Sequence, residues 1–195
     1  MKFSKKWLVP AAAMLPVLLL VLAVAGCGGD KAEADKLVKE ADDLRLQAAD
    51  GFRKSTAAID GLVRSAAAGQ VLPPNQTRAA VESASEELAA ALGDLTMRDD
   101  RLKAAGELDI GSAYREYLDL LRRSNDRLSE ALNMQLQTAT LLEQEQFSLA
   151  GWDEIRAEIV ISQIHGMQED IQHVFSESEQ LRNQAEQFKK DNGGF

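Results

Sequence analysis

Two histidines and a glutamate recur at intervals of four residues near the carboxyl end of the chain. His165, Glu169 and His173 would share one face of a helix, and imidazole and carboxylate groups are common metal ligands. His165 and His173 would nevertheless lie about 12 Å apart along the helix axis, so one ion could not readily contact both. Metal sites in helical bundles use Glu-x-x-His pairs from two helices, and no such pair is present. We therefore predict no metal site and expect solvent-exposed histidines.

Polar side chains also interrupt an apolar stripe in the third quarter of the chain. Asn125, Gln135 and Gln146 fall on or near this stripe. A buried polar residue can fix the register of a helical bundle at some cost in stability. Such residues could alternatively line a cavity for a small ligand, or lie exposed at the edge of the stripe. We favour the structural role and keep Asn125 and Gln135 as candidate ligand contacts.

A pair of tyrosines precedes that stripe, with arginines close by. Tyr114 and Tyr117 are candidate contacts for an anionic or glycan partner, because tyrosine and arginine are enriched at binding hot spots. The arginines can equally pair with acidic neighbours on a solvated helix face, and we favour that interpretation. The arginines are Arg115, Arg122, Arg123 and Arg127, and the acids are Asp119, Asp126 and Glu130.

Nothing in the sequence groups catalytic residues together. No His-Asp-Ser set, glycine-rich phosphate loop or Cys-x-x-Cys-His haem attachment is present. We predict a protein that is not an enzyme and needs no cofactor. The net charge is −9, and it falls near −12 without Lys2, Lys5 and Lys6, because 19 basic side chains then face 31 acidic ones. Such a charge repels nucleic acid, so we predict no nucleic-acid partner.

The amino terminus has the layout of a secretory signal peptide. Three lysines precede an apolar stretch, residues 7–25, that contains no charged residue. The stretch is about as long as a minimal membrane span, so an uncleaved anchor is the alternative. Val24-Ala25-Gly26-Cys27 ends it and resembles the lipobox of bacterial lipoproteins. Small residues before the single cysteine favour cleavage.

The resemblance implies a fate for Cys27. In bacterial lipoproteins the cysteine thiol receives a diacylglycerol, and a peptidase then cuts between the residues that correspond to Gly26 and Cys27. The mature chain would be held to the bacterial cell membrane by several acyl chains, with its domain outside the cytoplasm. Partners would be the membrane, through the lipid, and a protein of the cell envelope; the sequence also allows a homo-oligomer.

Helical periodicity dominates the rest of the chain. Apolar residues recur at steps of three, four and seven, and strong helix formers are abundant. Breaks are expected at Gly69 with Pro73-Pro74, at residues 106–112 and, less sharply, at Ala150-Gly151. The stripe after the last break is Trp152, Ile155, Ile159, Ile164, Met167, Ile171, Val174, Leu181, Ala185 and Phe188.

These patterns predict an all-α fold, an elongated antiparallel four-helix bundle over residues 31–192. A signal peptide at residues 1–26 and a short lipidated tether at 27–30 would precede the bundle, and a frayed tail at 193–195 would follow it. The alternative is a three-helix bundle, or a coiled-coil-like rod in which the third and fourth helices are joined. Alanine-rich stripes in the first two helices would permit close approach of their backbones.

Two functions are compatible with these features. The first, which we favour, is a non-enzymatic interaction or scaffold module of the cell envelope, tethered to the membrane. The second is a small-molecule binding or sensing bundle with a pocket between its helices. Burial of Asn125 and Gln135 around a void would favour the second function, and tight hydrogen bonding of these residues would favour the first.

Overall fold

A computed structural model of the chain describes the backbone of residues 15–70 and 72–195, and the side chains of residues 29–70, 72–151 and 153–195. Its helices are α1 (Leu15–Ala67), α2 (Pro74–Gly106), α3 (Ser112–Gln144) and α4 (Glu154–Asp191), with a short π-helix, η2 (Ser148–Trp152), before α4. The described residues contain no strand, so the all-α prediction is confirmed. The side chains of Gly26 and Cys27 lie outside the described part, as does the charged start of the chain.

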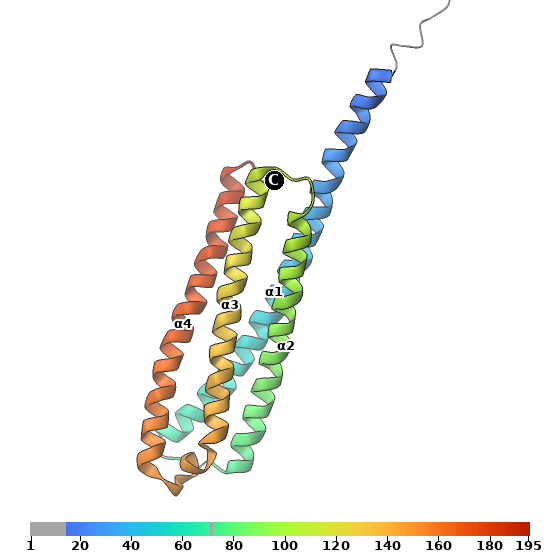
Figure 1. Cartoon of the computed structure of the whole chain (residues 1–195). Helices are drawn as coiled ribbons and strands as arrows, with labels where there is room; N and C mark the ends of the chain where they lie inside the picture. The colour runs from blue at the N-terminus through green and yellow to red at the C-terminus, as the bar shows by residue number, and fades with distance from the viewer. Residues whose placement is uncertain (1–14, 71) are drawn as a thin grey trace, which may run out of the picture.

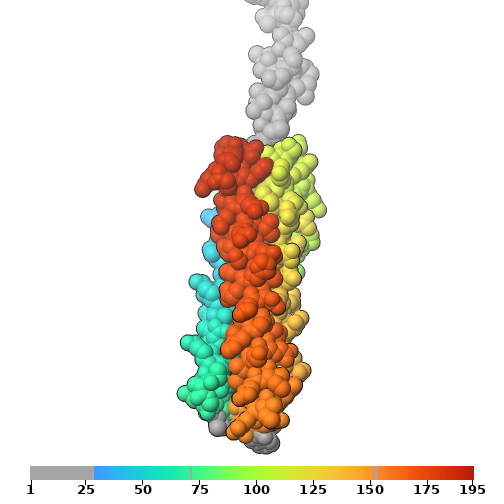
Figure 2. Space-filling model, turned by 90° about the vertical axis from the view of Figure 1, so that its left-hand side faces the viewer, coloured from blue at the N-terminus to red at the C-terminus, as the bar shows by residue number. Residues whose placement is uncertain are grey.

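The four long helices lie side by side and alternate in direction along the chain (Figure 1). We call one end of the bundle proximal: it holds the C-terminus and the α2–α3 connection (107–111), and α1 continues beyond it. The distal end holds the α1–α2 connection (68–73) and the α3–α4 connection (145–153). Figure 2 shows α4 along one whole face, with α1 on one side and α3 on the other. Contacts are extensive within the α1–α2 and α3–α4 pairs and sparse between α1 and α4.

A seven-residue repeat generates the core. Buried positions on α2 alternate between steps of three and four residues, which keeps one seam facing the neighbouring helices, as in coiled coils. These positions are Thr77, Val81, Ala84, Leu88, Ala91, Leu95, Arg98, Leu102 and Ala105. The buried apolar side chains form a proximal, a central and a distal cluster, stacked along the bundle.

Small residues set the closest approach between helices. A Cβ on Gly51 of α1 would lie 3.1 Å from the backbone oxygen of Glu87 and 3.2 Å from the Cβ of Ala91 on α2. On α3 and α4, Ser124 and Ser178 each donate a hydrogen bond to the other's backbone oxygen, at 2.9 and 2.8 Å. Glycine, alanine and serine therefore let the two pairs of helices pack tightly.

The structure differs from the sequence prediction at the C-terminus, whereas the lipidated tether at residues 27–30 stays a prediction. Helix α1 begins at Leu15 and runs through residues 27–30, the expected tether, since the preceding residues are rich in leucine and alanine. At the other end, Gly193 and Gly194 adopt positive φ angles of 91° and 70° and turn the chain back. The Phe195 ring then lies 5.0 Å from that of Tyr114. The tail is packed, not frayed.

The break between α3 and α4 is real, but the stripe predicted for α4 is wrong at its start. Gly151 has φ 82°, a conformation that ends the preceding helical segment. Ile155 is 75% exposed and Ile159 is 53% exposed, whereas Val160 and Ile164 are buried. The first turns of α4 carry two adjacent apolar stripes, and only the one that contains Val160 faces the core.

Candidate functional site

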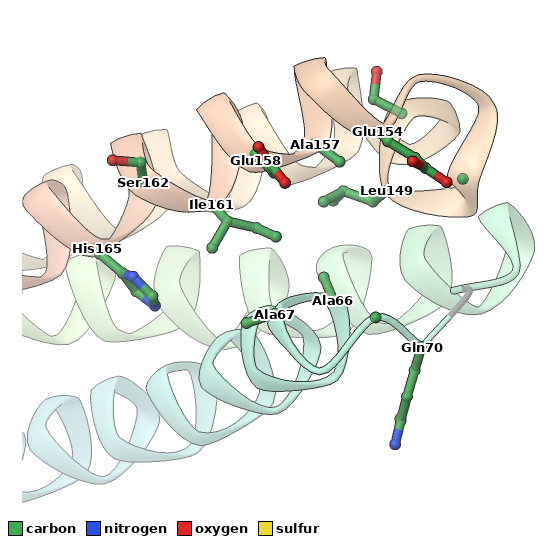
Figure 3. Close-up of a pocket in the computed structure, with 13 residues that line it drawn as sticks. Ala66, Ala67, Gln70, Leu149, Glu154, Ala157, Glu158, Ile161, Ser162 and His165 are labelled. Atoms are coloured by element: carbon green, nitrogen blue, oxygen red, sulfur yellow. The ribbon is translucent and has the colours of Figure 1, made fainter.

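The distal end contains a cleft between the last turn of α1 and the first turns of α4, with a volume of about 520 Å³ (Figure 3). In that view Leu149 and Ile161 lie on the side of α4 that faces α1, and Ala66 faces them from α1. The cleft exists because the lining is rich in small residues, which leave space where larger side chains would close the seam. The small lining residues are Ala66, Ala67, Gly69, Ser148, Gly151, Ala157 and Ser162.

The α3–α4 connection gives the cleft a fixed wall. Asp153 caps α4 by accepting a hydrogen bond from the backbone N–H of Arg156 at 2.9 Å. The Arg156 guanidinium reaches back to Glu145, with Nε 3.0 Å from Oε1. This hydrogen bond holds the pKa of Glu145 below its usual value. The connection is therefore tied to the start of α4 at two points.

The charges around the cleft are negative. Glu154 and Glu158 line it, and none of its lining residues is a lysine or an arginine. His165 closes one end of the cleft and lies near Asp60 of α1. Burial raises the pKa of Asp60, which accepts a hydrogen bond from Gln168. The cleft thus combines an apolar floor with an acidic rim.

Apolar side chains on the surface gather at the same end. Five large apolar residues with described side chains are exposed, and three of them lie in the distal connection or the first two turns of α4: Phe147, Ile155 and Ile159. Exposed apolar surface that clusters in this way is typical of interaction sites. The other two, Leu46 and Met97, lie apart on α1 and α2.

The candidate metal ligands do not come together around an ion. His165 faces the cleft, while Glu169 and His173 are exposed farther along α4. His173 Nε2 lies 3.5 Å from Glu177 Oε1 on the same helix. Among the described side chains, no group of three or more His, Cys, Asp or Glu residues is placed to hold a metal ion.

The tyrosine candidates lie in the core of the proximal end. Tyr114 is buried and donates a hydrogen bond to Asp35 at 2.8 Å, and Tyr117 contacts Glu186 at 3.4 Å. Burial raises the pKa of both tyrosines, since it disfavours the phenolate. Together with Phe195 they form an aromatic cluster at this end. Tyr114 does not line an open pocket, whereas Tyr117 lines a shallow, charged one with Asp42, Glu186 and Lys189.

Asn125 belongs to a polar layer between the proximal and central clusters, and its principal partner is a residue that the sequence prediction missed. Arg98 is 0% exposed, and its Nη1 donates to Asn125 Oδ1 at 3.0 Å and to the backbone oxygen of Leu121 at 3.3 Å. Asn125 in turn donates to the backbone oxygen of Leu95 at 3.1 Å. Burial lowers the pKa of Arg98 to about 10. The sequence feature that could have identified Arg98 as buried is its position three residues after Leu95 and four before Leu102, in the same repeat.

Other charged groups complete this layer. Arg45 of α1 is buried and forms an ion pair with Glu179 of α4. Asp42 lies near Arg98, and burial raises the pKa of its carboxyl group. The layer therefore links α1 to α4, where backbone contacts are sparse, through long side chains.

Gln135 of α3 is also buried, and it follows the central-cluster residue Leu132 along the helix. Its Nε2 has no hydrogen-bond partner among the described residues. Gln146 accepts a hydrogen bond from Arg78 at 3.4 Å and donates one to the Glu143 backbone at 2.9 Å. None of Asn125, Gln135 and Gln146 lines the distal cleft.

Comparison with known proteins adds no family. Within the residues that the structure describes in full, no helix is both long and apolar enough to cross a membrane. No protein-family model matches the chain, and neither does any curated protein or solved structure.

Proposed function

We propose that the chain is a membrane-anchored, extracytoplasmic lipoprotein that acts as a non-enzymatic interaction module of the bacterial cell envelope. Acylated Cys27, the first residue after cleavage at Gly26, would hold the protein to the cell membrane. An antiparallel four-helix bundle would then present the distal cleft to a partner protein. The observation that carries this proposal is the clustering of exposed apolar side chains and an open cleft at the end farthest from Cys27 along α1.

The geometry around Asn125 supports this function over a small-molecule sensor, whereas Gln135, whose Nε2 has no partner among the described residues, does not discriminate between the two. Asn125 is held by Arg98 and by the Leu95 backbone, so its hydrogen bonds are used within the protein. A ligand that bound there would have to displace these contacts and expose a buried guanidinium, which is costly. The hydrogen bonds of Asn125 favour one register of the helices, although Nε and Nη2 of Arg98 have no partner among the described residues.

The experiment is site-specific photo-cross-linking of the lipidated protein in its native membranes. A photoreactive residue replaces Ile159 at the distal end in one version and the exposed Glu116 of α3 in a matched control. We expect one dominant protein adduct from position 159, a much weaker one from position 116, and loss of the adduct in a Cys27→Ala version. Equal labelling from both positions would contradict distal docking, and an adduct that survives in Cys27→Ala would contradict the role of the anchor.

A further inference from the structure

The distal cleft has a definite chemical preference, and we infer that it binds a basic amphipathic segment of a partner protein. Such a segment carries apolar side chains flanked by lysine or arginine. The inference rests on the proposed function, because it specifies which partner chemistry the distal end would select. The volume of about 520 Å³ is in the range of pockets that bind ligands, roughly 300–1,000 Å³.

The floor of the cleft accounts for the apolar half of this preference. Leu149, Ala157 and Ile161 line it from the α4 side, and Ala66 lines it from α1. On the adjacent face of α4, Ile155, Ile159 and Ser162 follow at steps of four and three residues, and Ser162 also lines the cleft. The exposed isoleucines therefore form a second apolar strip along the same turns of α4, separated from the cleft floor by Glu154 and Glu158. A partner helix with apolar anchors at positions i, i+3 and i+4 is long enough to cover these first turns of α4.

The rim of the cleft accounts for the basic half. Glu154 and Glu158 are exposed one turn apart, and no lysine or arginine lines the cleft to neutralise them. A segment with an acidic flank would be repelled, whereas lysine or arginine would complement both carboxylates. A second copy of this chain is disfavoured as the occupant, because the chain carries a net charge of −9.

The test is binding of a labelled probe to the full chain in nanodiscs of phosphatidylcholine, measured by fluorescence anisotropy. The probe is a designed helical peptide of leucine, alanine and lysine, and its counterpart carries glutamate in place of lysine. Empty nanodiscs correct for binding to lipid. We expect the lysine peptide to bind at least tenfold more tightly than the glutamate peptide, and its affinity to fall as salt concentration rises.

Two kinds of variant locate the binding site. Glu154→Gln/Glu158→Gln removes the rim charges and should weaken binding about three- to tenfold, as expected for exposed ion pairs. Glu82→Gln/Glu86→Gln changes an exposed pair with the same spacing on α2 and should leave binding unaltered. Ala157→Phe fills the cleft and should reduce binding by more than tenfold; circular dichroism shows whether this variant keeps its helices.

Several outcomes would overturn the inference. These are equal binding of the two peptides, equal effects of the two glutamine pairs, or a dimer in sedimentation that only Ala157→Phe dissociates. None of them decides the proposed function, because the photo-cross-linking from position 159 is independent of partner charge. If position 159 forms the protein adduct but the chain binds the lysine and glutamate peptides equally, distal docking stands and a basic occupant is rejected.

Discussion

The two ends of the bundle differ in which side chains they bury: the proximal end buries polar groups, and the distal end leaves apolar groups exposed. The proximal half buries two arginines, two tyrosines and an asparagine, and the C-terminal Phe195 packs against the tyrosine rings. The distal end exposes Ile155 and Ile159 and leaves a cleft open between α1 and α4. Both arrangements cost free energy relative to an ordinary apolar core and polar surface.

The difference shows how one helical repeat can serve two purposes. At the proximal end, the hydrogen bonds of Arg98 and Asn125 favour one arrangement of α2 against α3, since a shift in register would break them. At the distal end, small residues in the same repeat leave room, and apolar residues beside the repeat stay accessible. The first end would fix the structure, and the second would offer a surface for binding.

The largest effect is expected from breaking the proximal polar layer. Asn125→Leu removes an acceptor from the buried Arg98 and should lower the free energy of unfolding by about 2–4 kcal/mol. Urea denaturation measures this change. The control is Arg98→Met/Asn125→Leu, which removes both partners and should be close to the original stability or above it. A double variant less stable than Asn125→Leu would show that the layer stabilises the bundle.

The two tyrosines provide a titration that reports on the proximal end alone, since the chain has no others. Their raised pKa values mean that the neutral phenols add stability, which is complete below the unfolded pKa of about 10 and is lost as pH rises through the folded pKa. Arg98, with its pKa lowered to about 10, acts in the opposite sense: its contribution to stability grows as pH rises above that value.

Absorbance of the phenolate near 295 nm separates these contributions. We expect the tyrosines to ionise at least about one pH unit above 10, which corresponds to about 1.4 kcal/mol for each, and to do so together with loss of helicity. The unfolded chain in urea is the reference. Ionisation of either tyrosine near pH 10 in the folded chain would contradict the burial of these rings.

A smaller effect is expected from opening the aromatic cluster. Phe195→Ala removes ring contacts at 5.0 Å to Tyr114 and 5.7 Å to Tyr117, and should destabilise the bundle by about 1 kcal/mol. Amide hydrogen exchange should accelerate at the start of α3 and leave the distal turns unchanged. Uniform acceleration along α3 would mean that Phe195 supports the whole bundle, not only its proximal end.

The smallest change in stability is expected from substitutions on the distal surface. Ile155→Ser/Ile159→Ser should alter the free energy of unfolding by less than about 0.5 kcal/mol, because both side chains are mostly exposed. The same variant should reduce the photo-cross-link formed from the cleft residue Ser162. Thermal melting and cross-linking yield are measured on one preparation. A loss of stability comparable to that of Asn125→Leu would show that these residues belong to the core.

Periodicity made most of the fold predictable and hid two features. Leu88, Leu95 and Leu102 are buried, as expected for apolar residues that recur at intervals of seven, because such a repeat has one core-facing side. Arg98 occupies the same repeat but was missed, since a lone arginine is ordinarily on the surface. Ile155 and Ile159 were assigned to the core, because a helix with two apolar stripes does not reveal which one is covered.

The distal cleft is harder to predict from the sequence than the helices are. It joins three separate segments, residues 66–70, 148–151 and 154–165, and depends on how α4 sits against α1. Gly151 signalled a break, and its positive φ angle explains the reversal, but the sequence does not show which faces meet after that reversal. Small residues create a cavity only when the surrounding larger residues hold the helices apart.

The continuity of α1 has a kinetic consequence for an anchored molecule. From Cys27 to Ala67 the helix has no break, and at 1.5 Å per residue it spans about 60 Å. If Cys27 is acylated as proposed, this continuous helix sets the distance between the anchor and the cleft to about 60 Å, which is the greatest height above the lipid that the cleft can reach. A membrane partner whose docking segment lies within this distance of the lipid would meet the cleft at high effective concentration, and one whose segment lies farther out would not.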